Sequence, residues 1–138
     1  MKIFITHSHG NRPLYRQVVR TLKQAGLDVW DDECDTYGDN WAKVTGEALE
    51  QSDALVVLIT PDALDSVIVH RDVGFALTNI QFEYRVIPVL VGVEQSVAVK
   101  SFSWIIRNLE LVTMPVSDGH QEGIDQITHA LQSLKAVA

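Results

Sequence analysis

Six consecutive apolar residues in the middle of the chain, Ala54 to Ile59, restrict the possible folds more than any other feature of the sequence. The run is rich in valine, and Ser52-Asp53 and Thr60-Pro61 bound it on either side. A strand without polar alternation is typical of a parallel sheet that helices cover on both faces. We therefore predict that this segment is the central strand of a sheet.

The residues after Pro61 predict a short loop over 62–66 and then a helix. An apolar stripe at helical spacing supports the helix, and it consists of Val69, Val73, Ala76, Leu77 and Ile80. Ligands of open parallel sheets bind beyond the carboxyl ends of the strands. The loop and the start of the helix fall at such an end, so Ser66 and Asp72 are the first candidates for chemistry.

Strand-like and helix-like segments alternate five times along the chain. The expected strands are Ile3–Thr6, Leu27–Trp30, Ala54–Ile59, Val86–Val91 and Leu109–Met114. This alternation predicts an α/β fold with a parallel sheet and helices on both faces. Because crossovers are right-handed, the simplest arrangement is a flavodoxin-like three-layer domain with a five-stranded parallel sheet.

Local signals indicate where several elements begin and end. Pro13 suits the first turn of a helix, and Gly26 suits the position just after its end. Asn40 and Asp118 can cap later helices. Pro88 lies inside the fourth expected strand. Proline cannot donate to a strand ladder, so its presence predicts the start of that strand or a sheet edge.

Length and charge limit the architecture and the partners. At 138 residues the chain is expected to form a single domain over residues 1–138, complete or excised from a longer protein. Its 11 basic and 18 acidic residues give a formal net charge of −7. An acidic chain argues against nucleic acid or an anionic membrane as the main partner.

The cysteine count and the apolar runs predict the compartment. Cys34 is the one cysteine of the sequence, so an internal disulfide is impossible and a reducing compartment is the default. No apolar run approaches the roughly 20 residues that span a bilayer. Met1 leads directly into a strand pattern instead of a cleavable signal. The expected location is therefore cytoplasmic.

Several nucleotide and metal signatures are missing from the sequence or incomplete. It holds neither G-x-G-x-x-G nor G-x-x-x-x-G-K-[ST]. A phosphoreceiver domain needs an aspartate where the third strand ends, and Thr60-Pro61 stands there instead. His7 and His9 could face the same way and bind a metal, with Asp31, Asp32 and Glu33 completing the site. No third ligand is placed by spacing, so we predict no bound metal.

Five short segments, in order along nearly the whole chain, resemble the sequence boxes of Toll/interleukin receptor (TIR) domains of the bacterial kind. The first box of the family is Phe-Ile-Ser-(Tyr or His)-Ser, and the second is Gly-x-x-Val-Trp-x-Asp-Glu. The third is Gly-Asp-x-Trp, the fourth is Ala-Leu-x-x-Ser-Asp, and the fifth lies in the fourth strand. The matching segments are Phe4-Ile5-Thr6-His7-Ser8, Gly26 to Glu33, Gly38-Asp39-Asn40-Trp41, Ala48 to Pro61 and Ile87-Pro88-Val89.

The resemblance implies one of two functions, since TIR domains either assemble signalling complexes or cleave NAD⁺. The cleaving members carry a glutamate in the pattern Ser-x-Trp-x-x-x-Glu near the start of the third helix. Here Ser66 matches the serine, Ile68 takes the tryptophan position and Asp72 takes the glutamate position. A shorter carboxylate and a lost ring both depart from the pattern. Misplacing a catalytic group by about 1 Å can cost on the order of 10²-fold in rate.

A carboxylate at Asp72 still suits this chemistry, because breaking the ribosyl–nicotinamide bond builds positive charge on the ribose. In the first hypothesis, the chain is an NAD⁺ nucleosidase of bacterial defence or cell-death signalling, with NAD⁺ as substrate and no cofactor. The residues expected to line its pocket are Phe4, Thr6, His7, Trp30, Asp31, Trp41, Ser66 and Ile68. The product, linear or cyclic ADP-ribose, is left open.

The second hypothesis is a non-catalytic assembly module. It would signal by self-association with other TIR domains through the acidic segment 31–39 and the exposed face of the third helix. In this interpretation Asp72 is an acid in the first turn of the helix, where the helix dipole favours a negative charge. Enzymes of the family commonly need side-by-side assembly as well, so a homo-oligomer on activation is expected under both hypotheses.

Overall fold

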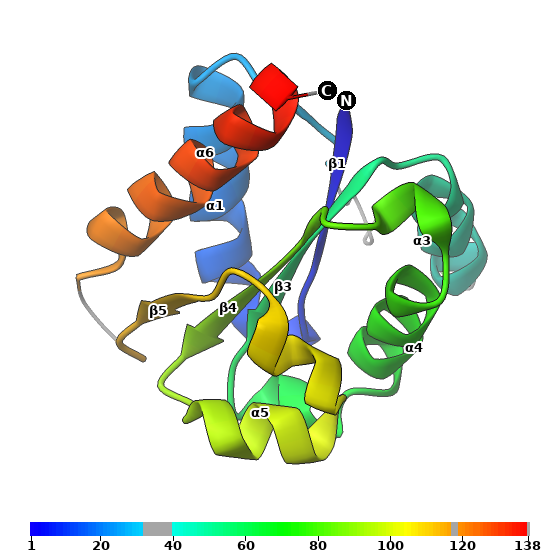
Figure 1. The fold of residues 1–138 in the computed structure, drawn as a ribbon, viewed down its shortest axis with the longest axis vertical. Coiled ribbons are helices and arrows are strands. Elements are labelled where there is room, and N and C mark those ends of the chain that lie inside the picture. The colour runs from blue at the N-terminus through cyan, green and yellow to red at the C-terminus, as the bar shows by residue number, and fades with distance from the viewer. Residues whose placement is uncertain (32–39, 117–118, 138) are drawn as a thin grey trace.

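The computed structural model describes residues 1–31, 40–116 and 119–137. Their sheet has the strand order β2-β1-β3-β4-β5, and every pair of neighbours is parallel. The strands are β1 (Lys2–Thr6), β2 (Asp28–Val29), β3 (Ala54–Ile59), β4 (Val86–Val91) and β5 (Val112–Met114). The predicted five-stranded parallel sheet of a flavodoxin-like fold is confirmed (Figure 1).

Helices cover both faces of the sheet. They are α1 (Arg12–Gln24), α3 (Trp41–Glu50), α4 (Val67–Leu77), α5 (Gln95–Ser101) and α6 (His120–Val137). The described part of the chain also contains four short 3-10 helices, η1 (His9–Asn11), η3 (Asp62–Asp65), η4 (Ile80–Phe82) and η5 (Trp104–Asn108). Figure 1 shows α1 and α6 on one face and α3, α4 and α5 on the other. Among the described residues, no helix has the length and apolarity that crossing a membrane requires.

The central strand β3 connects the two halves of the core. All six of its residues are buried. Val56 and Leu58 pack into the apolar cluster beneath α1 and α6, while Leu55 and Val57 pack into the cluster beneath α3 and α4. Both faces of β3 are therefore apolar, as the unbroken run predicts. Its central position in the strand order confirms the prediction.

Strand β4 corrects the expectation that Pro88 marks a sheet edge or a strand start. β4 lies between β3 and β5, and Pro88 is buried in its middle. Because Leu55 N donates to Arg85 O, alternate residues of β4 face β3, and the nitrogen of Pro88 faces the other side. The pairing with β5 begins only at Val89. Proline therefore stands where no ladder donor is needed.

One helix end differs from the sequence pattern, and one predicted cap lacks its hydrogen bond. Helix α4 ends at Leu77, so Ile80 is 85% exposed, and Phe82 of η4 is buried beside Ala76 in its place. Asn40 stands at the N-cap position of α3, but its side chain makes no capping hydrogen bond. Gly26 has a φ of +84° and ends α1 as expected. The proposed cap at Asp118 lies outside the described residues.

Candidate active site

Helix α4 carries Asp72 to the carboxyl end of β1. Its N-cap is Ser66, whose Oγ accepts a hydrogen bond from the backbone N–H of Val69 at 3.3 Å. The helix begins at Val67, so Asp72 lies in the second turn, and no acidic residue stands in the first. Dipole stabilisation fades beyond the first turn. The interpretation of Asp72 as a helix-start acid is therefore wrong.

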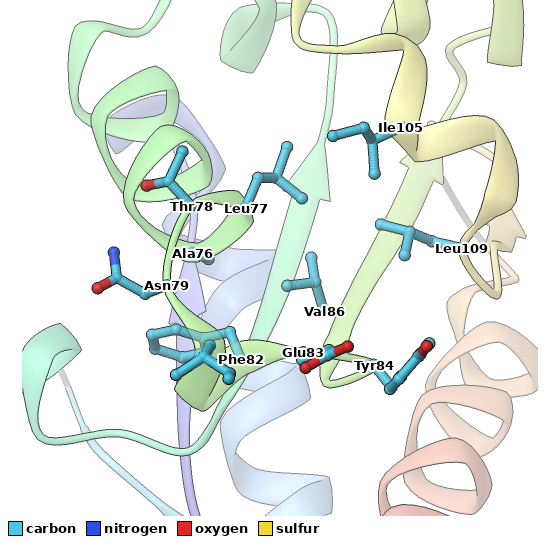
Figure 2. A pocket seen from close by; sticks show the side chains of 11 residues that line it. Ala76, Leu77, Thr78, Asn79, Phe82, Glu83, Tyr84, Val86, Ile105 and Leu109 are labelled. Atoms are coloured by element: carbon cyan, nitrogen blue, oxygen red, sulfur yellow. The ribbon is translucent and has the colours of Figure 1, made fainter.

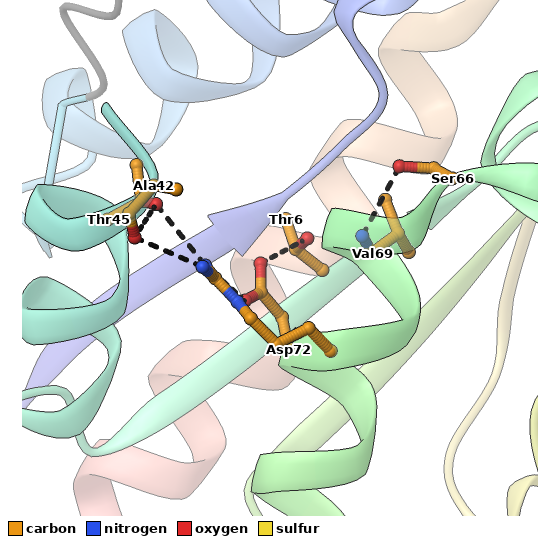
Figure 3. A network of polar contacts seen from close by, with 7 residues as sticks. Thr6, Ala42, Thr45, Ser66, Val69 and Asp72 are labelled. Atoms are coloured by element: carbon orange, nitrogen blue, oxygen red, sulfur yellow. Dashed lines mark hydrogen bonds and ion pairs between the residues drawn. The ribbon is translucent and has the colours of Figure 1, made fainter. Parts of the chain in front are cut away.

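The side chain of Asp72 is 1% exposed and points toward the sheet (Figure 3). Thr6, the last residue of β1, donates its hydroxyl to Oδ2 at 2.7 Å. Arg71 donates to the other oxygen, Oδ1, from Nε at 3.0 Å and from Nη2 at 2.8 Å. An ionised carboxylate so deep in the core is stable only with such charge-assisted partners.

Arg71 also ties α4 to the neighbouring helix α3. Its Nη1 donates to the carbonyl oxygen of Ala42 at 3.0 Å, and its Nη2 donates to Oγ1 of Thr45 at 3.2 Å. The Thr45 hydroxyl in turn donates to the Ala42 carbonyl at 3.1 Å. The guanidinium therefore connects the Asp72 carboxylate to the first turns of α3. Figure 3 shows Ala42 and Thr45 on that helix, on the side of Asp72.

Arg71 and Thr45 are the site residues that the sequence reasoning missed. Successive residues on a helix do not normally face each other, so Arg71 has no sequence signal as a partner of Asp72. The guanidinium reaches back because the arginine side chain is long, and that side chain is 35% exposed. Thr45 is polar on the buried face of α3, at 2% exposure. A polar residue on the helix face that is otherwise apolar was the sequence signal that could have identified Thr45.

Six of the predicted site residues line one cavity: Phe4, Thr6, His7, Trp41, Ile68 and Asp72, with Ile5 and Thr45 completing the wall. The cavity has a volume of about 10 Å³, roughly the space that a single water molecule needs. The site residues are therefore gathered around Asp72, but the space between them is too small for a ligand.

The other three predicted residues lie outside this lining. Trp30 stacks on Phe4 with ring centroids 5.4 Å apart, so it supports the cavity wall from behind. Asp31 is exposed and pairs with Lys23 Nζ at 3.2 Å. Ser66 serves as the N-cap of α4. The acidic segment named in the assembly hypothesis lies almost wholly outside the described residues.

His7 is a buried, neutral imidazole. Its ring stacks on Tyr15 of α1 with the centroids 3.9 Å apart. Burial, and after it the charge of Arg12, lower the pKa of His7 from 6.5 to about 4. Nδ1 has no hydrogen-bond partner among the described residues. Within the same residues no group of three or more His, Cys, Asp or Glu converges, and the expectation that the site holds no metal stays a prediction.

Comparisons with known proteins agree with this architecture. A family model described as TIR domain matches residues 3–128. Among solved structures, a metazoan TIR-STING receptor from C. gigas in complex with 2′,3′-cGAMP superposes with a TM-score of 0.71 at 18% sequence identity. The match covers 94% of this chain and 38% of that receptor, and at this identity it shows the fold alone. No curated protein matches the sequence.

Proposed function

The chain belongs to the TIR domain family, and from that premise we propose that it cleaves NAD⁺ at the bond between nicotinamide and ribose. The observation that carries the proposal is the carboxylate of Asp72. It is buried, lies at the carboxyl edge of the sheet and is held by Thr6 and Arg71. Ligands of parallel sheets bind at that edge. Bacterial defence or cell-death signalling is the setting that the family resemblance implies.

The chemistry needs a fixed negative charge more than it needs a strong acid. The electron pair of the C1′–N bond moves to the nicotinamide nitrogen, which becomes neutral, and positive charge develops on the ribose. Water then adds to C1′ and releases a proton. A carboxylate beside the ribose stabilises that charge as it forms. In this proposal Asp72 is that carboxylate, and Thr6 holds its orientation through Oδ2.

The remaining cavity residues would shape the substrate pocket. Phe4 and His7 form its floor, and Trp41 stands on the α3 side with its ring 4.7 Å from that of His9. Ile68 lines the cavity at the position where the family pattern has tryptophan. An isoleucine offers no flat surface for stacking an aromatic ring of the ligand. We therefore expect weaker substrate binding than a tryptophan at this position would give.

Substrate entry requires the site to open. A cavity of about 10 Å³ is far below the roughly 300 Å³ or more of typical ligand sites. The side chains of Trp41 and Ile68 must separate, and Arg71 must release Oδ1 of Asp72 before that oxygen can face a ribose. In the proposed mechanism this opening accompanies the side-by-side assembly of several domains.

The small volume of the cavity favours a second function, that of a non-catalytic assembly module. If Asp72 stays bound to Arg71 and Thr6 in every state, its carboxylate only joins α4 to α3 and β1. The protein would then act by self-association with other TIR domains. The two functions differ in whether the ion pair at Asp72 ever opens.

The test is the release of nicotinamide from NAD⁺ by concentrated protein. Asp72→Asn keeps the side-chain shape but removes the charge, so it should abolish release. Asp72→Glu, alone or with Ile68→Trp, restores the family pattern and should keep or raise the rate. Asp65→Asn is the matched control, because Asp65 is an exposed acid of the preceding η3. The enzyme proposal fails if wild type, Asp72→Glu and the double variant all release no nicotinamide.

A further inference from the structure

A second cavity lies at the opposite end of the sheet from Asp72. It has a volume of about 420 Å³ and is bounded by the C-terminal end of α4, by η4 and by η5, above the first residue of β4 (Figure 2). Asp72 instead meets the last residue of β1. Because the strands are parallel, the two sites lie at opposite ends of the strands. Nothing in the proposed NAD⁺ chemistry uses this cavity.

The cavity lies between the C-terminal end of α4 and η5, over Val86 at the start of β4. Helix α4 ends at Leu77, one turn short of the sequence pattern, and α5 has only seven residues. The space between the end of α4 and η5 is walled by Leu77 and by Ile105 and Leu109, with Val86 beneath (Figure 2). Its size falls within the range of about 300–1,000 Å³ seen for small-molecule sites.

Two large side chains stand exposed at the rim. Ile80 is 85% exposed and Tyr84 is 82% exposed, and both line the cavity. Tyr84 has a φ of +63°, and among the described residues it is the one non-glycine residue with positive φ. An aromatic residue is strained in this region, and such strain concentrates at functional sites. Packing does not account for it, since the ring lies largely in solvent.

The polar groups of the cavity favour a ligand that carries a positive charge. Glu83 is the one charged side chain among the described residues that line it. The hydroxyl of Thr78 and the amide nitrogen of Asn79 already donate to backbone carbonyls of α4, at 2.9 and 2.6 Å. A carboxylate attracts an ammonium group through its negative charge, and the face of a neighbouring tyrosine ring attracts the same group through a cation–π interaction.

We propose that this cavity binds a small amphipathic cation, with an aromatic or aliphatic body against Leu77, Ile105 and Leu109 and one ammonium group at Glu83. The apolar wall supplies the burial, and the carboxylate selects the sign of the charge. Neither requirement depends on Asp72, so the inference holds or fails independently of NAD⁺ cleavage.

The test compares three compounds that share one body: 4-phenylbutylamine, 4-phenylbutanol and 4-phenylbutyrate. Each is titrated into ¹⁵N-labelled protein while backbone amide shifts are followed by NMR. Compounds of this size bind in the millimolar range. We expect the amine to shift the amides of Leu77, Thr78, Tyr84 and Leu109 and to bind about three- to five-fold more tightly than the alcohol. The butyrate should bind most weakly.

Charge variants show whether Glu83 causes the preference for the amine. Glu83→Gln should remove the preference for the amine while leaving binding of the alcohol unchanged. Glu122→Gln is the matched control, because Glu122 is an exposed acid on α6, on the other face of the sheet. Equal binding of all three compounds, shifts confined to other residues, or an amine preference that survives Glu83→Gln would overturn the proposal. Concentration-dependent shifts of the same amides without ligand would also overturn it, by showing a contact between copies.

Discussion

Replacing Arg71 with methionine should destabilise the protein more than replacing its partner Asp72 with asparagine. The reason is the difference in burial, since the side chain of Arg71 is 35% exposed and that of Asp72 is 1% exposed. Without Arg71, the carboxylate stays in the core without its guanidinium partner and keeps the hydrogen bond from Thr6. Without the carboxylate, Arg71 can still reach water and keeps its bonds to Ala42 and Thr45.

The size of this asymmetry follows from the contacts. Removing one partner of a buried ion pair costs about 3–5 kcal/mol, and the Thr6 bond and the partial exposure of Arg71 favour the lower end. We expect about 3 kcal/mol for Arg71→Met. Asp72→Asn leaves no buried charge and should cost about 1 kcal/mol. In the double variant the two losses overlap, so it should cost about 2 kcal/mol less than their sum.

Urea unfolding at neutral pH, followed by tryptophan fluorescence, measures these free energies. At an m-value of about 2 kcal/mol/M, Arg71→Met should lower the midpoint by about 1.5 M. Arg20→Met is the matched control, because Arg20 is an exposed arginine of α1, and it should change the free energy by less than about 0.5 kcal/mol. The reasoning is refuted if Asp72→Asn costs as much as Arg71→Met, or if the coupling is below about 0.5 kcal/mol.

Three further predictions concern stability. The unfolded chain binds a proton at His7 before the folded protein does, because the folded pKa is lowered from 6.5 to about 4. Wild type should therefore lose roughly 3 kcal/mol relative to His7→Phe as the pH falls through that window, measured by urea unfolding at several pH values. Tyr84→Gly should raise the thermal midpoint, since it relieves a φ of +63° at an exposed residue and gains about 1 kcal/mol. Gly92→Ala should lower that midpoint by the equivalent of about 1–3 kcal/mol, because its φ is +67° and a new Cβ would collide with Cγ2 of Val116.

The long apolar strands were predictable from the sequence, and the short ones were less so. β3 and β4 have the predicted bounds, since each is an apolar run of six residues that must be buried on both faces. β2 has two residues and β5 has three, shorter than the expected segments, because β2 pairs with β1 only at Lys2 and Ile3 and β5 pairs with β4 only from Val89 onward. The edge assignment of Pro88 failed because it depended on where β5 begins, and local sequence does not encode that position.

The candidate site, too, was predictable from the sequence only in part. Family resemblance selected residues from three distant segments, and Thr6, Trp41 and Asp72 do line one cavity. The partner of the carboxylate could not be predicted, because Arg71 is adjacent to Asp72 in sequence and bonds it only through a side chain that folds back over α4. The volume of the cavity could not be predicted from the sequence either, because it depends on how closely α3 and α4 pack.

The ion pair of Arg71 and Asp72 separates the two functions, since they place opposite requirements on it. NAD⁺ cleavage needs Oδ1 of Asp72 to turn from the guanidinium to a ribose, so the pair must open during the reaction. An assembly module needs the pair intact, because it holds α3 against α4. Arg71→Met therefore lowers stability under both functions, but it raises nicotinamide release only if Asp72 is catalytic. Measured together on one variant, unfolding and product release assign the carboxylate to one function or the other.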